Sequence, residues 1–340
     1  MRRSAPKLRD VAAAVGISVA TVSKVLNGYS DVSAGTREAV LEAAQQLGYP
    51  MPGQIAPMAE QSCRVAMLIE DYRPGDVSSV LIYDVLMGFR HAMSEWDCEV
   101  ILLSTSSEQQ KRRKLRSLID YHNLRGAFIM GLKTSDPYLS EVKESEFPCV
   151  LFDVPIERPR AAWIGVDGLR GAAMAVEHLL KLGHRRIGFI NGHEQAFVSA
   201  ERMDGFAFAL HRAGLSLDPD CVVHADFTEA GGEAAALALL GAQPELTALF
   251  CAGDLMAIGA MKAARRMGLF VPKDLSVVGF DNILMAEHVQ PALTTIDQPK
   301  FQMGMLAAQL LQNLITDEAI GRLQIPPTLV VRGSTAELHL

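Results

Sequence analysis

Three aspartates stand directly after short apolar runs: Asp153 after VLF, Asp254 after LFCAG and Asp281 after SVVGF. Such runs are typical of buried parallel strands, whose carboxyl ends meet at one edge of a sheet. Carboxylates at such an edge can accept hydrogen bonds from the hydroxyls of a ligand or contribute to a metal site. No histidine that could serve as a metal ligand lies near these aspartates in the sequence. This favours a ligand with hydroxyl groups over a metal ion.

A second group of candidate residues lies on the solvent side of a short predicted helix near the start of the chain: Ala20, Thr21, Ser23 and Lys24. These side chains are small or polar, so they can approach DNA. The first 24 residues hold five basic residues and only Asp10 as an acid, a local charge of +4 in a chain of net charge −7. A basic end on an acidic body is typical of a protein that touches DNA with one end only.

The residues around these DNA-contact candidates are predicted to form two short helices joined by a tight turn. Apolar residues recur at helical spacing over 8–15, and Gly16 then interrupts the pattern with a residue that tolerates positive φ. Ser18 can cap a second helix over 19–27. Two helices joined in this way form a helix-turn-helix, whose second helix enters the DNA major groove. The alternative is a helical hairpin that packs against a larger domain.

A third helix and a linker follow. Ser33 can cap a helix over 36–47, which Gly48 ends. The stretch 49–61 contains Pro50, Pro52, Gly53 and Pro57, so a long helix is not expected there. The first three helices are therefore predicted to form a small separate module.

The rest of the chain alternates between strand patterns and helix patterns, which predicts parallel sheets covered on both faces. We expect strands at 65–70, 99–104, 127–130, 150–152 and 164–166, and a second series at 187–190, 221–225, 248–251 and 276–280. We expect helices at 81–96, 109–121, 169–182, 200–213, 230–240, 255–267 and 301–314. The segments 293–297 and 328–332 are expected to return as late strands, one to each sheet. Two α/β subdomains with facing sheet edges would enclose a cleft suited to a small molecule.

The composition excludes several classes of protein. The first ten residues hold no apolar run and no stretch of about 18 apolar residues occurs, which predicts neither a signal peptide nor a membrane span. The five cysteines are scattered without a CxxC, so we expect buried, reduced thiols and no disulfide or zinc framework. The sequence also has no P-loop, no GxSxG, no HExxH and no GxGxxG after its first strand, which argues against an enzyme.

A long ordered series of motifs carries a resemblance: LRDVAAAVGISVATVSKVLNG, DVSAGTREAV, LGY, VEHLLKLGHRRIGFI, GDLMAIGAM, DLSVVGFDN and LTTIDQP. From about Lys7 to its end the chain resembles the lactose-repressor (LacI/GalR-type) family of bacterial transcription regulators. The resemblance implies an α/β fold: a helix-turn-helix headpiece (1–49), a Pro-rich hinge (50–62) and a doubly wound core (63–340) similar to periplasmic sugar-binding proteins. The core would divide into an N-subdomain (63–163 and 292–325) and a C-subdomain (164–291 and 326–336).

The resemblance also assigns contacts to DNA. Val19, Ala20 and Lys24 would meet the bases, while Thr21 and Ser23 would contact phosphates. Two departures from the family pattern stand out. Lys7 occupies the place of a capping Thr or Ser, and the hinge lacks the usual Asn and Leu. Ile55 or Met58 could instead wedge into the minor groove, and the alternative is a flexible linker with weaker DNA bending.

The effector site that the resemblance implies comprises Asp153, Arg202, Phe227, Asp254, Asp281 and Gln298. Carboxylates and an arginine fork suit a polyhydroxyl ligand, and an aromatic ring can stack on a sugar or a base. Three alternatives stay open: Asp254 as a helix cap, Asp281 as a backbone contact and Phe227 as core. Further candidates for the cleft are Asp71, Ser78, Ser79, Asp84, Trp163 and His193, and Leu81 and Ile82 replace the family's aromatics.

We therefore expect a cytoplasmic homodimeric regulator, most simply a repressor, that needs no cofactor, metal or membrane and is not an enzyme. Its partners would be a near-palindromic operator DNA and a small effector, a sugar or a sugar derivative. The effector would bind between the core subdomains and control operator affinity.

Overall fold

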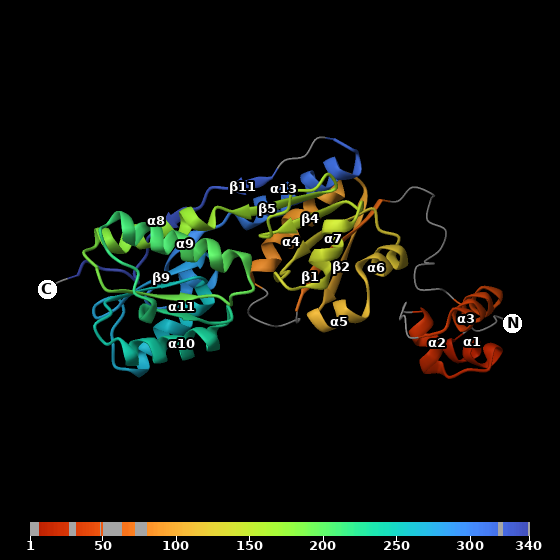
Figure 1. Ribbon diagram of the computed structural model, residues 1–340, viewed down its shortest axis with the longest axis horizontal. Helices are drawn as coiled ribbons and strands as arrows, with labels where there is room; N and C mark the ends of the chain where they lie inside the picture. The colour runs from red at the N-terminus through yellow and green to blue at the C-terminus, as the bar shows by residue number, and fades with distance from the viewer. Residues whose placement is uncertain are drawn as a thin grey trace.

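The structure is a computed structural model that describes residues 7–26, 32–47, 49, 63–71, 80–318 and 322–338. Three helices form an N-terminal lobe, here called the headpiece: α1 (Leu8–Val15), α2 (Val19–Leu26) and α3 (Ala34–Gln46). Two six-stranded sheets form the core. In Figure 1 the headpiece lies at one end of the molecule, and the two halves of the core follow along its long axis.

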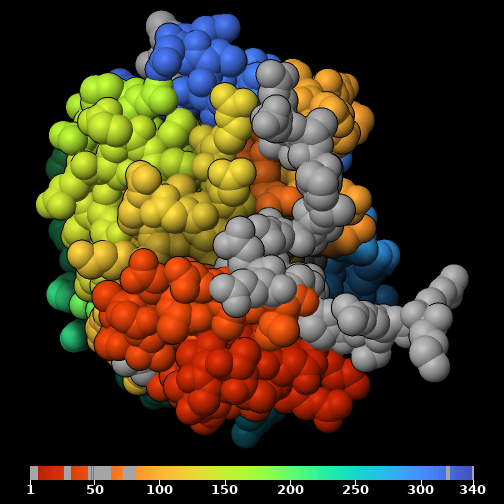
Figure 2. All heavy atoms as spheres, turned by 90° about the vertical axis from the view of Figure 1, so that its right-hand side faces the viewer, coloured from red at the N-terminus to blue at the C-terminus, as the bar shows by residue number. Residues whose placement is uncertain are grey.

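The headpiece has a small core of its own, made by one apolar stripe from each helix: Val11, Ala12, Val22, Val25, Leu26, Val40 and Ala44. Gly16 adopts φ 70 and ends α1, as its position in the sequence predicts. In Figure 2, which views the molecule from the headpiece side, these three helices form one compact red-orange lobe.

Two serines cap the headpiece helices as expected. The Ser18 hydroxyl accepts the Thr21 N–H at 3.1 Å, and the Ser33 hydroxyl accepts the Thr36 N–H at 3.3 Å. Lys7 supplies no side-chain cap to α1, but its N–H donates to the carboxylate of Asp10 at 2.6 Å. Half of a capping box therefore remains at the position that departs from the family pattern.

The first sheet has the strand order β11-β5-β4-β3-β1-β2, and all its strands are parallel. Its strands are β1 (Cys63–Glu70), β2 (Cys98–Thr105), β3 (Gly126–Met130), β4 (Cys149–Phe152), β5 (Ala161–Val166) and β11 (Leu323–Ile325). Its helices are α4 (Val80–Glu95), α5 (Ser107–Arg112), α6 (Leu115–His122), α7 (Pro137–Glu144) and α13 (Lys300–Ile315). We call this half the N-subdomain.

Alternate residues of β1, the neighbour of the edge strand β2, face opposite layers of helices, as the period of two requires. Val65, Met67 and Ile69 pack with α4 and α13, whereas Ala66 and Leu68 pack with α6 and α7. Both faces are covered, so the strand reads as an unbroken apolar run.

Two glycines let α4 and α13 approach closely. A Cβ atom on Gly88 would lie 2.0 Å from the Phe301 carbonyl oxygen, and one on Gly304 would lie 2.1 Å from that of Val85. No larger residue fits at either position without moving a helix backbone, so the two helices pack as one block.

The second sheet has the order β12-β10-β9-β8-β6-β7, and it is parallel except for the β10–β12 pair. Its strands are β6 (Ile187–Asn191), β7 (Val222–His224), β8 (Ala248–Cys251), β9 (Ser276–Asp281), β10 (Thr294–Asp297) and β12 (Thr328–Val330). Its helices are α8 (Gly168–Lys181), α9 (Phe197–Arg212), α10 (Glu229–Ala242), α11 (Asp254–Arg266), α12 (Met285–His288) and the short η2 (Pro219–Cys221). We call this half the C-subdomain.

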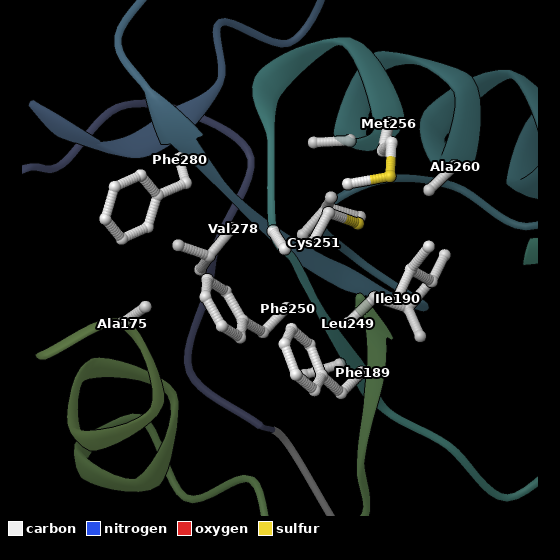
Figure 3. Close-up of a cluster of buried hydrophobic side chains, with 14 of the residues drawn as sticks. Ala175, Phe189, Ile190, Leu249, Phe250, Cys251, Met256, Ala260, Val278 and Phe280 are labelled. Atoms are coloured by element: carbon white, nitrogen blue, oxygen red, sulfur yellow. The ribbon is translucent and has the colours of Figure 1, made fainter. Parts of the chain in front are cut away.

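Stacked aromatic rings form the centre of the C-subdomain core (Figure 3). The rings of Phe189 and Phe250 lie 4.9 Å apart and nearly parallel, and Phe206 stacks on the other side of Phe189. Figure 3 shows Val278 between Phe280 and this stack, with Ala175 and its helix below Phe280 in the view. This packing fixes the strand ends from which the cleft is built.

The path of the chain between the sheets differs from the expected one. The segments 293–297 and 328–332 do not return to different sheets, because β10 and β12 pair with each other, antiparallel, in the second sheet. The late strand of the first sheet is instead β11, which the sequence analysis missed. The chain therefore passes from one subdomain to the other after Val166, after Asp297 and after Ile325. The expected boundary at 163/164 moves to the end of β5, and the expected boundary at 292 moves to the end of β10.

One expected helix is two helices. The stretch 109–121 divides into α5 and α6 because the chain becomes extended at Arg113 and Lys114. The Arg113 carbonyl accepts the Tyr138 hydroxyl at 2.8 Å, a contact from α7 that the sequence pattern does not show.

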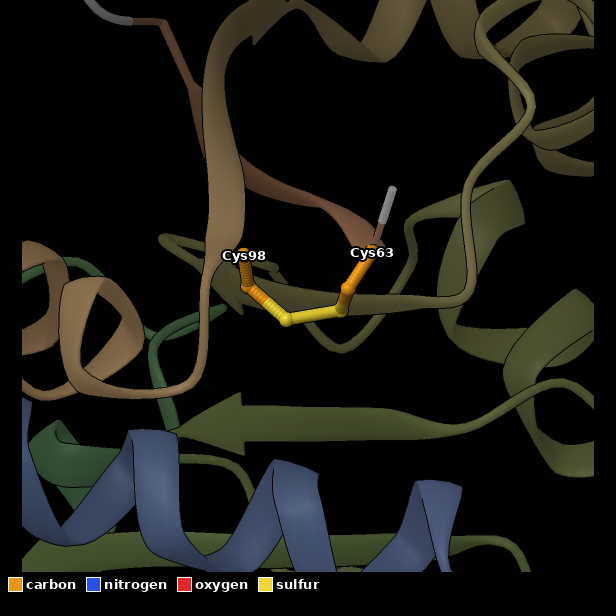
Figure 4. Close-up of a disulfide and its surroundings, with 2 residues drawn as sticks. All are labelled: Cys63 and Cys98. Atoms are coloured by element: carbon orange, nitrogen blue, oxygen red, sulfur yellow. A yellow bond between two sulfur atoms is a disulfide. The ribbon is translucent and has the colours of Figure 1, made fainter. Parts of the chain in front are cut away.

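The expectation that all cysteines are free thiols is wrong for two of them. Cys63 and Cys98 form a disulfide between the first residues of β1 and β2 (Figure 4). They are 35 residues apart, and only the parallel register of the two strands places them opposite each other. Cys149, Cys221 and Cys251 are free and buried, as expected.

Candidate functional site

A cavity of about 260 Å³ lies between the carboxyl ends of the two sheets. Residues from the ends of β1, β3 and β4 line one wall, and residues from α9, β9 and the loops after β7 and β8 line the other. Five of the six expected effector residues line it: Asp153, Arg202, Phe227, Asp281 and Gln298. The cleft between subdomains is thus where the sequence analysis expected it.

Arg202 lies at the polar end of the cavity and is held in place from three sides. It projects from α9, is 3% exposed, and its guanidinium carbon lies 3.8 Å from the ring centroid of Phe280. Its Nη1 donates to the Ala252 carbonyl, and its Nη2 lies 3.7 Å from Asp281 Oδ1. A guanidinium fixed in this way is ready for a ligand without further ordering.

Two polar atoms at this end are buried and lack a hydrogen-bond partner among the described residues: Arg202 Nε and Gln298 Oε1. Gln298 Nε2 donates to Asp281 Oδ1 at 2.5 Å, which fixes its amide so that Oε1 remains as an acceptor. Both side chains approach Asp281 Oδ1, and an unpartnered donor and an unpartnered acceptor suit a hydroxyl group, which both accepts and donates.

Two cavity carboxyls stand on unusual backbone. Asp153 has φ 57 and Asp281 has φ 110, both in the region that favours glycine. Burial raises the pKa of Asp153 to about 7 against the opposing effect of Arg202. Burial also raises the pKa of Asp281, which Arg202 and Lys300 oppose. Backbone held in sparsely populated regions clusters at ligand sites.

Phe227 presents its ring to the cavity from the loop after β7. The ring meets His193, which also lines the cavity, edge to face at 5.5 Å. A Cβ atom on Gly192 would lie 1.9 Å from the ring, so the glycine makes room for it. Phe227 is half-buried and adopts φ 63, and it packs against the C-subdomain core while it lines the cavity.

Asp254 is a correction to the expected set. It is 0% exposed and does not line the cavity. Its two oxygens accept from the Thr295 hydroxyl at 2.5 Å and the Ile283 N–H at 2.8 Å, so it ties α11 to β10 and to the loop after β9. Nor does it cap a helix that starts after it, because it is the first residue of α11.

Glu70 is a cavity residue that the sequence analysis missed. It is the last residue of β1, and its Oε1 accepts from Ser107 at 2.6 Å and from Lys133 at 3.2 Å. Burial, together with a hydrogen bond to Asp136, raises the pKa of Glu70. The signal was the one that identified Asp153, a carboxylate at the end of an apolar run.

Lys300, at the start of α13, is a second residue that was missed. It is 8% exposed, and its ammonium donates to the carbonyls of Asp281 at 2.6 Å, Asn282 at 3.0 Å and Gln298 at 3.3 Å. An N-subdomain helix therefore holds the C-subdomain loop that carries a cavity carboxylate.

Some of the further cleft candidates line the cavity, whereas others make structural contacts elsewhere. Ile82 lines the cavity, whereas Asp71 pairs with Lys133 at 3.0 Å, Asp84 is exposed and Trp163 packs in the core. Ser78 and Ser79 lie outside the described residues, as does the side chain of Leu81. The remaining lining is more apolar than expected and includes Met130, Leu132, Val154, Phe197, Val198, Leu255 and Ile283.

The outer face of α2 carries the expected DNA contacts. Val19 is 45% exposed, Ala20 and Lys24 are exposed, and Val22 faces inward. The other two expected contacts, Thr21 and Ser23, are half-buried, and the Thr21 hydroxyl lies 2.8 Å from that of Ser18. The expected minor-groove residues Ile55 and Met58 lie outside the described residues.

Within the part of the chain that the structure describes, no group of three or more His, Cys, Asp or Glu side chains is arranged to hold a metal ion. Over the same residues, no helix combines the length and the apolar character needed to cross a membrane.

Comparison with known proteins gives matches along the whole chain. Residues 7–50 match the family model "Bacterial regulatory proteins, lacI family", and residues 176–335 match "Periplasmic binding protein-like domain". The transcriptional regulator CelR of Thermobifida fusca is 33% identical, with 98% of this chain and 99% of CelR covered. The repressor CytR of Escherichia coli K12 is 32% identical, with 99% of this chain and 98% of CytR covered.

Two solved structures are similar over nearly the full length. A CelR–cellobiose complex has a TM-score of 0.73 at 32% identity and covers 97% of this chain and 99% of its own. A lac repressor dimer bound to operator and the anti-inducer ONPF has a TM-score of 0.72 at 27% identity and covers 98% and 100%.

Proposed function

Because the chain belongs to the lacI family of bacterial regulatory proteins, we propose that it is a transcription regulator whose operator affinity a small effector controls. One observation carries the proposal: a helix-turn-helix with an exposed, partly basic second helix precedes a core whose cavity lies between two sheets. DNA binding and effector binding are thereby assigned to separate parts of one chain. The protein is not an enzyme.

On the DNA side, α2 enters the major groove. Val19 and Ala20 contact base edges or thymine methyl groups, and Lys24 donates to a guanine or a phosphate. Thr21 and Ser23 contact phosphates, which position the helix without reading sequence. The exposure of Val19, Ala20 and Lys24 supports these roles.

On the effector side, the ligand is a sugar or a sugar derivative. Its hydroxyls meet Arg202, Asp281 and Gln298, whose unpartnered donor and acceptor suit such groups. Asp153 accepts from a further hydroxyl, and one apolar face of the ligand stacks on Phe227. The cellobiose in the CelR complex supports a carbohydrate, and the apolar remainder of the cavity favours one with an extended apolar face.

The two functions are coupled through the contacts that join the subdomains. Lys300 of α13 holds the Asp281–Asn282 loop, and the Thr134 N–H donates to the Gln195 carbonyl across the cleft at 3.0 Å. An effector that changes the relative orientation of the subdomains changes the spacing of the two headpieces. Effector and DNA affinities are then linked reciprocally, typically by ~1–3 kcal/mol.

The protein acts as a homodimer in the cytoplasm, where two headpieces read the half-sites of a near-palindromic operator. We assign residues 1–49 to DNA binding, 50–62 to the hinge and 63–340 to effector binding and dimerisation. No cofactor is required for either step.

The test combines two measurements on the full-length protein. Double-stranded DNA is selected from a random pool, and melting temperature is followed against a carbohydrate panel that includes cellobiose. We expect enrichment of two inverted half-sites and a rise in melting temperature with at least one sugar. A pool without an enriched sequence would contradict the DNA-binding role, and a panel without any shift would contradict the carbohydrate class of the effector.

A further inference from the structure

The disulfide between Cys63 and Cys98 closes the β1–α4–β2 unit at its beginning. The two residues stand opposite each other in the parallel register with Cα atoms 4.5 Å apart (Figure 4). The next pair in the register, Arg64 and Glu99, forms an ion pair at 2.7 Å. A covalent bond and an ion pair therefore fasten the same two strands at the same end.

This end of the sheet faces away from the effector cavity. Glu70 at the carboxyl end of β1 lines the cavity, and Cys63 begins the strand seven residues earlier. At a rise of about 3.3 Å per residue the two lie roughly 23 Å apart. Cys63 also begins β1, the first strand of the core, so among the described core residues it lies nearest the headpiece along the chain.

Cys63 differs from the other four cysteines in access. It is half-buried, whereas its partner Cys98, which follows a turn residue Asp97 at φ 52, is 8% exposed. Cys149 and Cys251 are 0% exposed, and burial raises the pKa of the Cys149 thiol to about 12. Burial likewise raises the pKa of the Cys221 thiol. Thiols held protonated are poor nucleophiles, which disfavours the oxidation of these three cysteines.

We propose that the Cys63–Cys98 bond is a reversible redox switch that gives the protein a second input to DNA binding, separate from the effector. This proposal rests on the proposed DNA-binding function. Disulfides of cytoplasmic proteins are typically transient and redox-sensing, since the compartment keeps thiols reduced.

The chemical step is thiol–disulfide exchange with a small-molecule disulfide. The thiolate of one cysteine attacks a sulfur of that disulfide, which releases one small thiol and leaves a mixed disulfide on the protein. The thiolate of the other cysteine displaces the second small thiol. Two protein thiols are thereby oxidised to one disulfide, and one small disulfide is reduced to two thiols.

The oxidised form is the one that binds operator more tightly. With the bond closed, the start of β1 cannot separate from β2, so the point at which the headpiece chain joins the core is held in place. Less conformational freedom then remains to be lost when both headpieces of a dimer settle on their half-sites. Reduction restores that freedom and weakens binding.

The experiment uses the full-length protein, DNA selected with it from a random pool, and equilibration with either dithiothreitol or oxidised glutathione. Thiol titration after denaturation, with peptide mapping, reports the bond: the oxidised chain should show three thiols and the reduced chain five. The affinity for the selected DNA is then measured for both forms. We expect reduction to weaken it about 5-fold or more, the lower end of ordinary coupling between sites.

Two variants make the result specific. The double variant C63A/C98A should bind like the reduced chain under both conditions, whereas C221S, which alters a buried free cysteine, should keep the full redox response. Failure of the bond to form, equal affinities, tighter binding by the reduced chain, or a redox response in C63A/C98A would each overturn the proposal. A chain that selects no DNA in either form contradicts the proposed function itself, and the thiol count then still reports whether the bond forms.

Discussion

The guanidinium carbon of Arg202 lies 3.8 Å from the ring centroid of Phe280, the residue before Asp281 in β9. A side chain of the effector cavity is thus held by the aromatic core of the C-subdomain, and contacts of this kind contribute about 2 kcal/mol when desolvated. Because the packing of Phe280 sets the position of Arg202, the cavity exists before a ligand arrives.

Replacing Arg202 by alanine should remove the response to the effector and leave operator binding in place. The change deletes the unpartnered Nε donor and the group that faces Asp281. Effector binding is measured by calorimetry with a sugar from the panel, and DNA binding by electrophoretic mobility shift.

Arg212→Ala is the matched control for this change. Arg212 lies on the same helix, its side chain is 65% exposed, and it meets Glu177 at 3.5 Å on the surface. It should leave both affinities unchanged. A normal dose response in the Arg202 variant would remove Arg202 from the proposed site.

Asp153→Asn should flatten the dependence of stability on pH. The pKa of Asp153 is raised from 3.8 to about 7 in the folded chain, so its protonated form is favoured by folding. Its contribution to stability is full below the unfolded pKa of about 4 and is lost as pH rises through about 7. The melting temperature of the wild type should therefore fall, relative to that of the variant, between about pH 4 and pH 7.

The variant Asp204→Asn changes an exposed aspartate on α9 and should follow the wild type over this window. Parallel curves for the wild type and the Asp153 variant would show that this carboxyl does not titrate near neutral pH.

Lys24→Ala should weaken binding to the selected operator, by roughly 1–3 kcal/mol if the lysine reads a base. Arg9→Ala removes one positive charge from α1 instead and measures the effect of charge alone. If Lys24 contacts only a phosphate, both variants reduce the salt dependence by about one unit of slope and neither changes the sequence preference. An unchanged footprint for Lys24→Ala would mean that α2 is not the recognition helix.

Asp254→Ala should lower stability rather than effector affinity. It leaves the Thr295 hydroxyl and the Ile283 N–H without their acceptor, and each unpaired buried donor costs about 1–3 kcal/mol. Urea unfolding measures the loss, with the exposed Asp220→Ala as control. If the variant keeps full stability but no longer binds the effector, Asp254 contacts the effector after all.

The sequence predicted most of the fold because its signals are local. Buried strands such as β3 and β8 read as apolar runs, and the caps at Ser18 and Ser33 follow from residue type. β11 was missed because three residues, only one of them buried, carry no periodic signal. The break between α5 and α6 was missed because the contact from Tyr138 comes from a later helix.

A site residue could be predicted where a carboxylate follows a strand in the sequence. It could not be predicted where contacts with distant residues determine the direction of the side chain. Asp153 and Asp281 line the cavity, yet Asp254 follows a similar run and turns into the structure, because a donor from β10 and a donor from the loop after β9 take its oxygens. The bond between Cys63 and Cys98 depends on the register of two strands, which no spacing in the chain reveals.

The chain passes three times between the two sheets, and this limits which recombination events keep both subdomains intact. Neither subdomain is one continuous stretch: the first sheet takes its edge strand β11 from the end of the chain, and α13, between β10 and β12, packs on its other elements. A genetic exchange with a single breakpoint inside the core would combine elements from two parent proteins within at least one subdomain. Recombination can keep both modules intact only at the junction between headpiece and core. New pairings of operator and effector should therefore arise by joining whole headpieces to whole cores.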